Sequence, residues 1–113
     1  MNNPDRPVYL RLRDHIAASI LEGHYRDGDP LPSVRAFAAK HGVNPLTVAK
    51  AYQIFQDEGL IEVRRGVGMF LAEGATARLF VSERKLFLED HWPRVAALIR
   101  RLDIDPAELL ERC

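Results

Sequence analysis

The chain has 113 residues, 47% hydrophobic and 28% charged, so it is long enough for one small domain with a core and one appended element. This length excludes a multidomain enzyme. Sixteen basic and sixteen acidic residues give a net charge of zero, which excludes a global electrostatic signature of nucleic-acid binding. No apolar run approaches the roughly 20 residues of a membrane helix, and residues 1–5 lack the start of a signal peptide. We therefore expect a cytoplasmic protein without a membrane segment.

The first predicted element is an amphipathic helix over residues 8–22. Leu12, Ile16 and Ile20 recur there at four-residue steps, which places them on one face of a helix. The glycine that follows is typical of a helix end. Residues 23–30 contain glycine, proline and an Asp-Gly pair, so we expect them to form a connecting loop.

Two short helices follow, joined by a tight turn. Ser33 can cap a helix that runs to about residue 41, where a glycine ends it. Asn44 is a strong N-cap and Pro45 suits the first helical position, so the next helix begins there. Apolar side chains keep helical spacing up to residues 57–58.

The period then changes to that of a strand. Within residues 60–65, Ile61 and Val63 alternate with Glu62 and Arg64. Residues 66–68 can turn the chain, and residues 69–71 can return as a second strand. Three helices followed by a hairpin is the order of a winged helix-turn-helix. The predicted fold class is mostly α with a small β-hairpin. We expect a DNA-binding domain over residues 1–73 and a helical dimerisation region over residues 74–113.

The second region carries an apolar seam that suits a helix. Residues of the seam alternate between four and three positions apart. Because Pro93 falls inside it, we expect either one kinked helix or two helices that meet near residues 91–93. Asp105-Pro106 begins a short terminal helix. The apolar residues that we predict to form a dimer are Leu79, Phe80, Leu86, Phe87, Leu88, Trp92, Val95, Ile99 and Leu102. The alternative is that this region folds back over its own chain.

Four motifs in residues 7–71 resemble the successive signatures of the GntR family of regulators. They are Leu31-Pro32-Ser33-Val34-Arg35, Gly42-Val43-Asn44-Pro45-Leu46-Thr47-Val48, Asp57-Glu58-Gly59-Leu60-Ile61 and Arg65-Gly66-Val67-Gly68-Met69-Phe70. Asn-Pro-x-Thr-Val-x-Lys-Ala-Tyr and the short helical tail are most similar to the YtrA-like branch. The resemblance implies a homodimeric repressor that binds double-stranded operator DNA, with a transporter operon as its neighbour. It names neither the operator nor an effector.

Within that resemblance, the DNA contacts carry over to specific positions. Asn44 and Pro45 have capping as an alternative or additional role, and Arg35 and Lys50 have an alternative role as solvated surface charges. For Arg64 and Arg65 the alternative is a charged hairpin end that only protects a strand edge. A guanidinium can pair with phosphate or guanine, threonine can touch phosphate or a thymine methyl, and glycines at a wing tip allow close approach to the backbone. The predicted contact residues are Ser33, Arg35, Asn44, Pro45, Leu46, Thr47, Lys50, Arg64, Arg65, Gly66 and Gly68.

Other classes of function find little support in the sequence. The four histidines are scattered over separate predicted elements, and no phosphate loop or nucleophile motif is present. The single cysteine, Cys113, can form neither an internal disulfide nor a zinc site by itself. We therefore expect no enzymatic activity, metal or cofactor. A winged helix that binds another protein in place of DNA is the stronger alternative.

Overall fold

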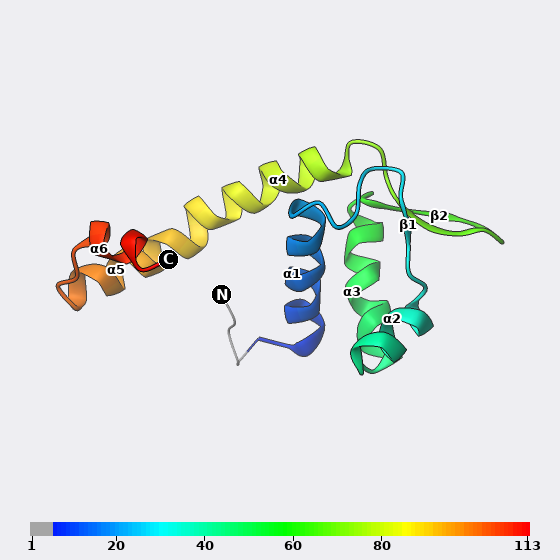
Figure 1. Cartoon of the computed structure of the whole chain (residues 1–113), viewed down its shortest axis with the longest axis horizontal. Helices are drawn as coiled ribbons and strands as arrows, with labels where there is room; N and C mark the ends of the chain where they lie inside the picture. The colour runs from blue at the N-terminus through cyan, green and yellow to red at the C-terminus, as the bar shows by residue number, and fades with distance from the viewer. Residues whose placement is uncertain (1–5) are drawn as a thin grey trace. The chain divides into compact units, whose positions relative to one another are not determined.

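The computed structural model describes residues 6–113 and divides the chain into two units, the first ending at Leu79 and the second comprising Phe80–Cys113 (Figure 1). Residues 1–5, on which the expectation about a signal peptide rests, lie outside the described residues. Across the part that is described, no helix is long and apolar enough to cross a membrane.

Three helices form most of the first unit: α1 spans Val8–Leu21, α2 spans Val34–His41 and α3 spans Pro45–Asp57. All three helices predicted from the sequence are confirmed. Helix α3 packs against both α1 and α2. The turn between α2 and α3 begins at Gly42, whose φ of 63° lies in the left-handed region that favours glycine. The helix-turn-helix is therefore set by a short sequence signal.

A small antiparallel sheet completes the first unit. Strand β2 spans Ile61–Arg64 and β3 spans Gly68–Leu71, which confirms the predicted hairpin. A third strand, β1 over Pro30–Leu31, pairs with β3, so the strand order is β1-β3-β2. The expected loop is thus wrong at its last residue, because two residues are too few to show a strand pattern. Pro30 is tolerated there because β1 is an edge strand.

The core of the first unit gathers side chains from the three helices, the sheet and the start of the next helix, α4 (Ala75–Leu86). Phe55 is fully buried in α3, and Ile20, Leu71 and Leu79 are each 1% exposed. Tyr52 is also buried and donates its hydroxyl to the Pro32 carbonyl at 2.9 Å, and burial raises the pKa of this phenol. The buried side chains of α3 lie after its first turn, and the first two residues of that turn are exposed to solvent.

The helical tail contains α4 (Ala75–Leu86), a π-helical segment η1 (Phe87–His91), α5 (Trp92–Arg101) and α6 (Pro106–Glu111). Of the two predicted arrangements around Pro93, the structure has two α-helices, but they are separated by the five residues of η1, and α5 begins one residue before Pro93. The Trp92 N–H donates to the Phe87 carbonyl, five residues back. Pro93 has no N–H and its ring crowds the carbonyl four residues back, which favours such a widened turn. The predicted terminal helix is confirmed.

Candidate nucleic-acid interface

The first turn of α3 presents side chains and keeps its backbone donors occupied. Asn44 Oδ1 accepts the Leu46 N–H at 2.8 Å, and the Asn44 carbonyl accepts the Thr47 N–H at 3.0 Å. Pro45, at the first helical position, has no N–H. The predicted capping role of Asn44 and Pro45 is confirmed. Because these donors are bonded internally, a nucleic acid would meet side chains at this end of α3, not free N–H groups.

Three side chains follow on this turn and the next. Leu46 is 73% exposed, Thr47 is half-buried and Lys50 is exposed. Leucine in such an exposed position contributes nothing to the core, whereas apolar side chains in a major groove contact the thymine methyl group. Lys50 Nζ lies 5.5 Å from the centre of the Tyr9 ring, a cation–π contact that restricts where the ammonium points. No sequence pattern indicates this role for Tyr9, because α1 and α3 meet only in the folded chain.

The start of α2 offers a second cation. Ser33 Oγ accepts the Ala36 N–H at 3.1 Å, so the predicted cap is confirmed and the serine oxygen is engaged locally. Arg35 is exposed in the first turn, and its guanidinium has no hydrogen bond or ion pair within the described part of the chain. Of the residues predicted here, Arg35 is the one whose polar group remains available to a phosphate.

The hairpin separates its two arginines into different roles. Arg64 Nε lies 3.4 Å from Glu62 Oε1, and the Arg64 guanidinium carbon lies 4.1 Å from the centre of the Phe70 ring. These contacts hold Arg64 along the strand. Arg65 follows β2, is exposed and has no side-chain partner among residues 6–113. The sequence treats both arginines alike, and the structure makes Arg65 the freer of the two.

The tip of the hairpin is a tight turn with an apolar end. Gly66 and Gly68 have φ values of 76° and 142°, in the region that favours glycine. No atom lies within 4 Å of the position of an added Cβ at either residue, so backbone conformation and not crowding explains them. Val67 between them is 72% exposed. The predicted contact residues include Gly66 and Gly68 but not Val67. An apolar residue between two glycines of a hairpin turn is the sequence signal that could have identified it.

Hydrogen bonds between distant segments hold the start of α4 against the rest of the first unit. The Asp27 carboxylate accepts the Gly74 N–H at 2.8 Å, the Thr76 N–H at 3.1 Å and the Thr76 hydroxyl at 2.7 Å. The bonds from Thr76, followed by the Gly74 bond and the Arg78 charge, hold the pKa of Asp27 below its ordinary value. Arg78 in turn donates to the Gly59 carbonyl at 2.8 Å, just after α3 ends. These bonds tie the start of α4 both to the segment that joins α1 to β1 and to the residues that follow α3.

The predicted dimer-forming residues are not equally accessible. Leu79 is 1% exposed in the core of the first unit, so it is unavailable to a second chain and its assignment is corrected. Val95 and Ile99 are half-buried. The other six are exposed: Phe80, Leu86, Phe87, Leu88, Trp92 and Leu102. Val81, Leu98 and Leu110 are exposed as well and were not predicted.

The chain is similar to known bacterial regulators at the level of sequence. Residues 8–71 match the family described as bacterial regulatory proteins, gntR family. The uncharacterised HTH-type transcriptional regulator YhcF of Bacillus subtilis is 40% identical over 70 residues, which cover 62% of this chain and 58% of that protein. The HTH-type transcriptional repressor YtrA of Bacillus subtilis is 36% identical over 83 residues, or 74% of this chain and 64% of that protein. The matches thus span less than two thirds of both relatives.

Solved structures are similar over longer stretches. A GntR family transcriptional regulator from Listeria monocytogenes superposes with a TM-score of 0.76 at 27% identity, covering 97% of this chain and 95% of that one. The DNA-binding domain of AraR, in complex with an operator, superposes with a TM-score of 0.54 at 26% identity. That match covers 58% of this chain and 80% of the AraR chain. The first likeness thus extends through the helical tail, and the second is confined to a smaller part.

Proposed function

Because the chain belongs to the GntR family of bacterial regulatory proteins, which are DNA-binding transcriptional regulators, we propose that it is a homodimeric repressor of a pseudo-palindromic operator. The first unit reads the DNA, and the second unit joins two chains. The protein acts in the cytoplasm, and its operator precedes a transporter operon. The similarity to the transcriptional repressor YtrA of Bacillus subtilis supports repression as the mode. The choice of locus rests on the resemblance of the α3 motif to the YtrA-like branch.

The observation that carries the proposal is the first turn of α3. Leu46 and Thr47 form an apolar and a hydroxyl contact surface there, and Lys50 follows one turn later, held by Tyr9. Side chains of these types read base edges and methyl groups in the major groove, which is where the second helix of a helix-turn-helix docks. The bonded N–H groups around Asn44 keep this turn regular. We therefore assign sequence discrimination to α3.

Two free cations supply the contacts that are independent of sequence. Arg35 at the start of α2 and Arg65 at the hairpin tip are exposed and without partners in the described part of the chain. Guanidinium groups bind phosphate bidentately, and contacts to phosphate position a protein on the duplex. The glycines beside Arg65 allow the tip to approach the sugar-phosphate chain or the minor groove. Arg64 contributes less, because Glu62 and Phe70 already engage it.

The second unit supports the assignment of a homodimer. None of its residues is buried, and its exposed side chains include Phe80, Phe87, Trp92 and Leu102. Large exposed apolar patches are typical of protein interfaces. A second copy of the same chain presents the same face, and a twofold axis between two such faces matches the symmetry of an inverted repeat. A dimer formed by the tail therefore predicts an operator with two inverted half-sites.

Selection of the full chain against a pool of random duplexes tests the proposal. We expect enrichment of an inverted repeat whose half-sites lie about one helical turn apart, or a multiple of it, and an affinity that falls steeply with salt. The control is a Leu46→Ala, Thr47→Ala double variant. It should retain most of its affinity for random duplex and fail to enrich the same repeat, because both side chains lie on the proposed base-reading turn.

Two results would contradict the proposal. If no repeat is enriched, the proposed sequence-specific binding is wrong. If only a single half-site is enriched, the proposed dimer is wrong. Absence of duplex binding even at low salt would favour a winged helix that binds another protein.

A further inference from the structure

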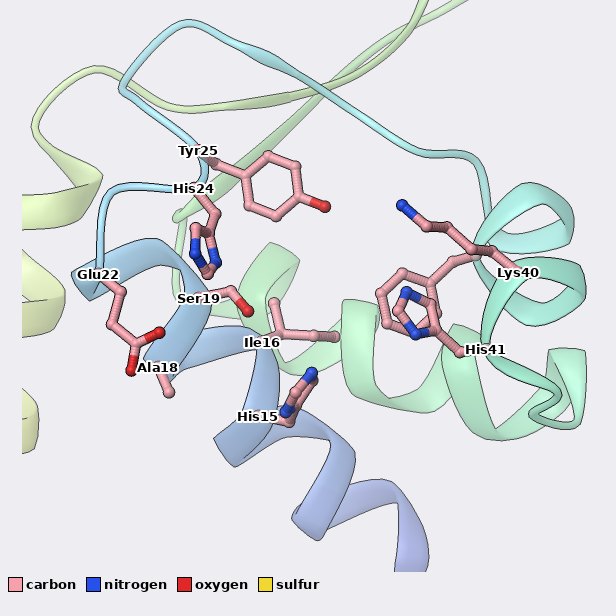
Figure 2. Close-up of a pocket in the computed structure, with 10 residues that line it drawn as sticks. His15, Ile16, Ala18, Ser19, Glu22, His24, Tyr25, Lys40 and His41 are labelled. Carbon is pink, nitrogen blue, oxygen red and sulfur yellow. The ribbon is translucent and has the colours of Figure 1, made fainter.

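A cavity of about 430 Å³ opens in the first unit between α1, α2 and the segment that joins α1 to β1 (Figure 2). This volume lies in the range of roughly 300–1,000 Å³ that is typical of small-molecule sites. Ile16 and Phe37 line it with apolar surface and are themselves buried, at 4% and 5% exposed. No residue of the proposed DNA-reading set lines this cavity. It is therefore a separate feature of the fold.

The cavity also collects aromatic rings from elements that are far apart in sequence. The four histidines are scattered along the chain, but His15, His24 and His41 line this one opening. The His41 ring lies 4.2 Å from Phe37 and 6.5 Å from His15, measured between ring centroids. No three metal-ligating groups within residues 6–113 are arranged to hold a metal ion. The rings instead provide flat walls beside the apolar floor, which suits a flat ligand.

Hydrogen-bond donors complete the opening. Figure 2 shows the Lys40 side chain and the Tyr25 hydroxyl directed into it, with the Ser19 hydroxyl facing them from α1. The Lys40 ammonium forms no ion pair within the described residues. Glu22 lies at the other end, and its carboxylate is turned away from these donors in Figure 2. The charge that faces the cavity is thus positive.

We propose that this cavity binds a small aromatic carboxylate. The ring of the ligand lies against Ile16, Phe37 and the imidazole of His41. Its carboxylate accepts hydrogen bonds from Lys40 and Tyr25, and the bond from an ammonium to a carboxylate is the stronger kind. The apolar walls and the positive rim together favour an aromatic carboxylate over simpler ligands. A neutral ring would leave Lys40 unpaired, and an inorganic anion would leave the apolar walls in water.

Titration of the full chain with benzoate, followed by two-dimensional amide NMR, tests the assignment without DNA. We expect saturable shifts at the lining residues of α1 and α2, with the weak affinity of a ligand of this size. Benzamide and benzylamine should bind about tenfold more weakly, because neither offers a carboxylate to Lys40. Benzylamine also tests the opposite assignment, in which Glu22 would anchor a cation.

Two lysine variants localise the site. Lys40→Met keeps the length of the side chain and removes its charge, so it should weaken benzoate binding about tenfold. The matched control Lys85→Met, on the exposed surface of α4, should bind as the unmodified chain does. Tyr25→Phe should cause a smaller loss, because it removes a neutral donor. Equal binding of benzamide, an unaffected Lys40→Met variant or absence of saturable shifts would each overturn the assignment, and none of them bears on DNA binding.

Discussion

The two units of the chain bury their apolar side chains to very different extents. In the first unit, Val48, Ala51 and Phe55 are fully buried in α3. In the second unit no residue is buried, and Phe80 and Leu102 are 56% and 62% exposed. Since burial of apolar surface is the main favourable term in folding, the first unit has the core of an independent domain and the second unit lacks one.

This difference in burial indicates which kind of partner suits each unit. The exposed groups that we assign to DNA in the first unit are cations, Thr47 and the apolar Leu46, held on a buried core, and the cations suit a charged duplex. The exposed groups of the second unit include many large apolar side chains beside charged ones, and such apolar side chains suit another protein surface. Under the proposed function, the placement of the apolar residues separates DNA reading from assembly. The predictions below test that separation, from the largest expected effect to the smallest.

Two phenylalanines give the sharpest contrast between the units. Phe55→Ala should lower the free energy of unfolding by about 3–5 kcal/mol, because it opens a cavity in the core of the first unit. Phe80→Ala should change that free energy by less than about 0.5 kcal/mol and should instead weaken the dimer. Urea unfolding and sedimentation of both variants provide the measurements. If Phe55→Ala and Phe80→Ala lower the free energy of unfolding by similar amounts, the two units do not differ in this way.

Removal of the second unit should separate assembly from reading. A chain that ends after Leu79 keeps Ala75, Arg78 and Leu79, which the core of the first unit requires. It should be folded and monomeric, and should bind a full operator about a hundredfold more weakly while its affinity for one half-site is retained. Sedimentation and fluorescence anisotropy measure the two quantities. A dimeric fragment would assign the dimer contact to the first unit. A full chain that is monomeric at micromolar concentration would contradict the proposed homodimer.

Within the first unit, α3 and the hairpin should differ in what they recognise. Thr47→Ala and Lys50→Met should each weaken operator binding by about 1–3 kcal/mol and affect random duplex less. Arg65→Ala should weaken both to the same degree and reduce the salt slope by about one, because it removes one phosphate contact. Arg112→Ala, beyond α6, is the matched control. Equal losses for all three variants on both duplexes would contradict this division.

The smallest effect is expected where the first unit is tied to the start of α4. Bonds from Thr76 and Gly74 lower the pKa of Asp27, so its contribution to stability is present above the ordinary pKa of 3.8 and is lost as the pH falls through the lower folded value. Asp27→Asn keeps an acceptor and should reduce the melting temperature slightly near neutral pH. Thermal unfolding at several pH values should show this difference disappear in acid. A difference that persists there would exclude the charge as its cause.

Local signals predicted much of the fold and part of the candidate site. Ser33 and Asn44 cap helices through N–H groups two or three residues away, so sequence spacing alone identifies both caps. The positions of Leu46 and Thr47 in the first turn of α3 follow directly from the second cap. The role of Tyr9 beside Lys50 did not follow, because no spacing rule connects residues that lie on different helices.

The sequence by itself determined the three helices, the hairpin and the short terminal helix, because capping residues and the apolar period act over a few positions. Only the tertiary structure decided which exposed groups remain available. It engaged Arg64 and left Arg65 free, placed Leu79 in the core and brought three histidines to one cavity. It also paired β1 with a strand that begins far along the chain. Such contacts depend on how the elements pack, and packing is a property of the whole folded chain and not of any local pattern.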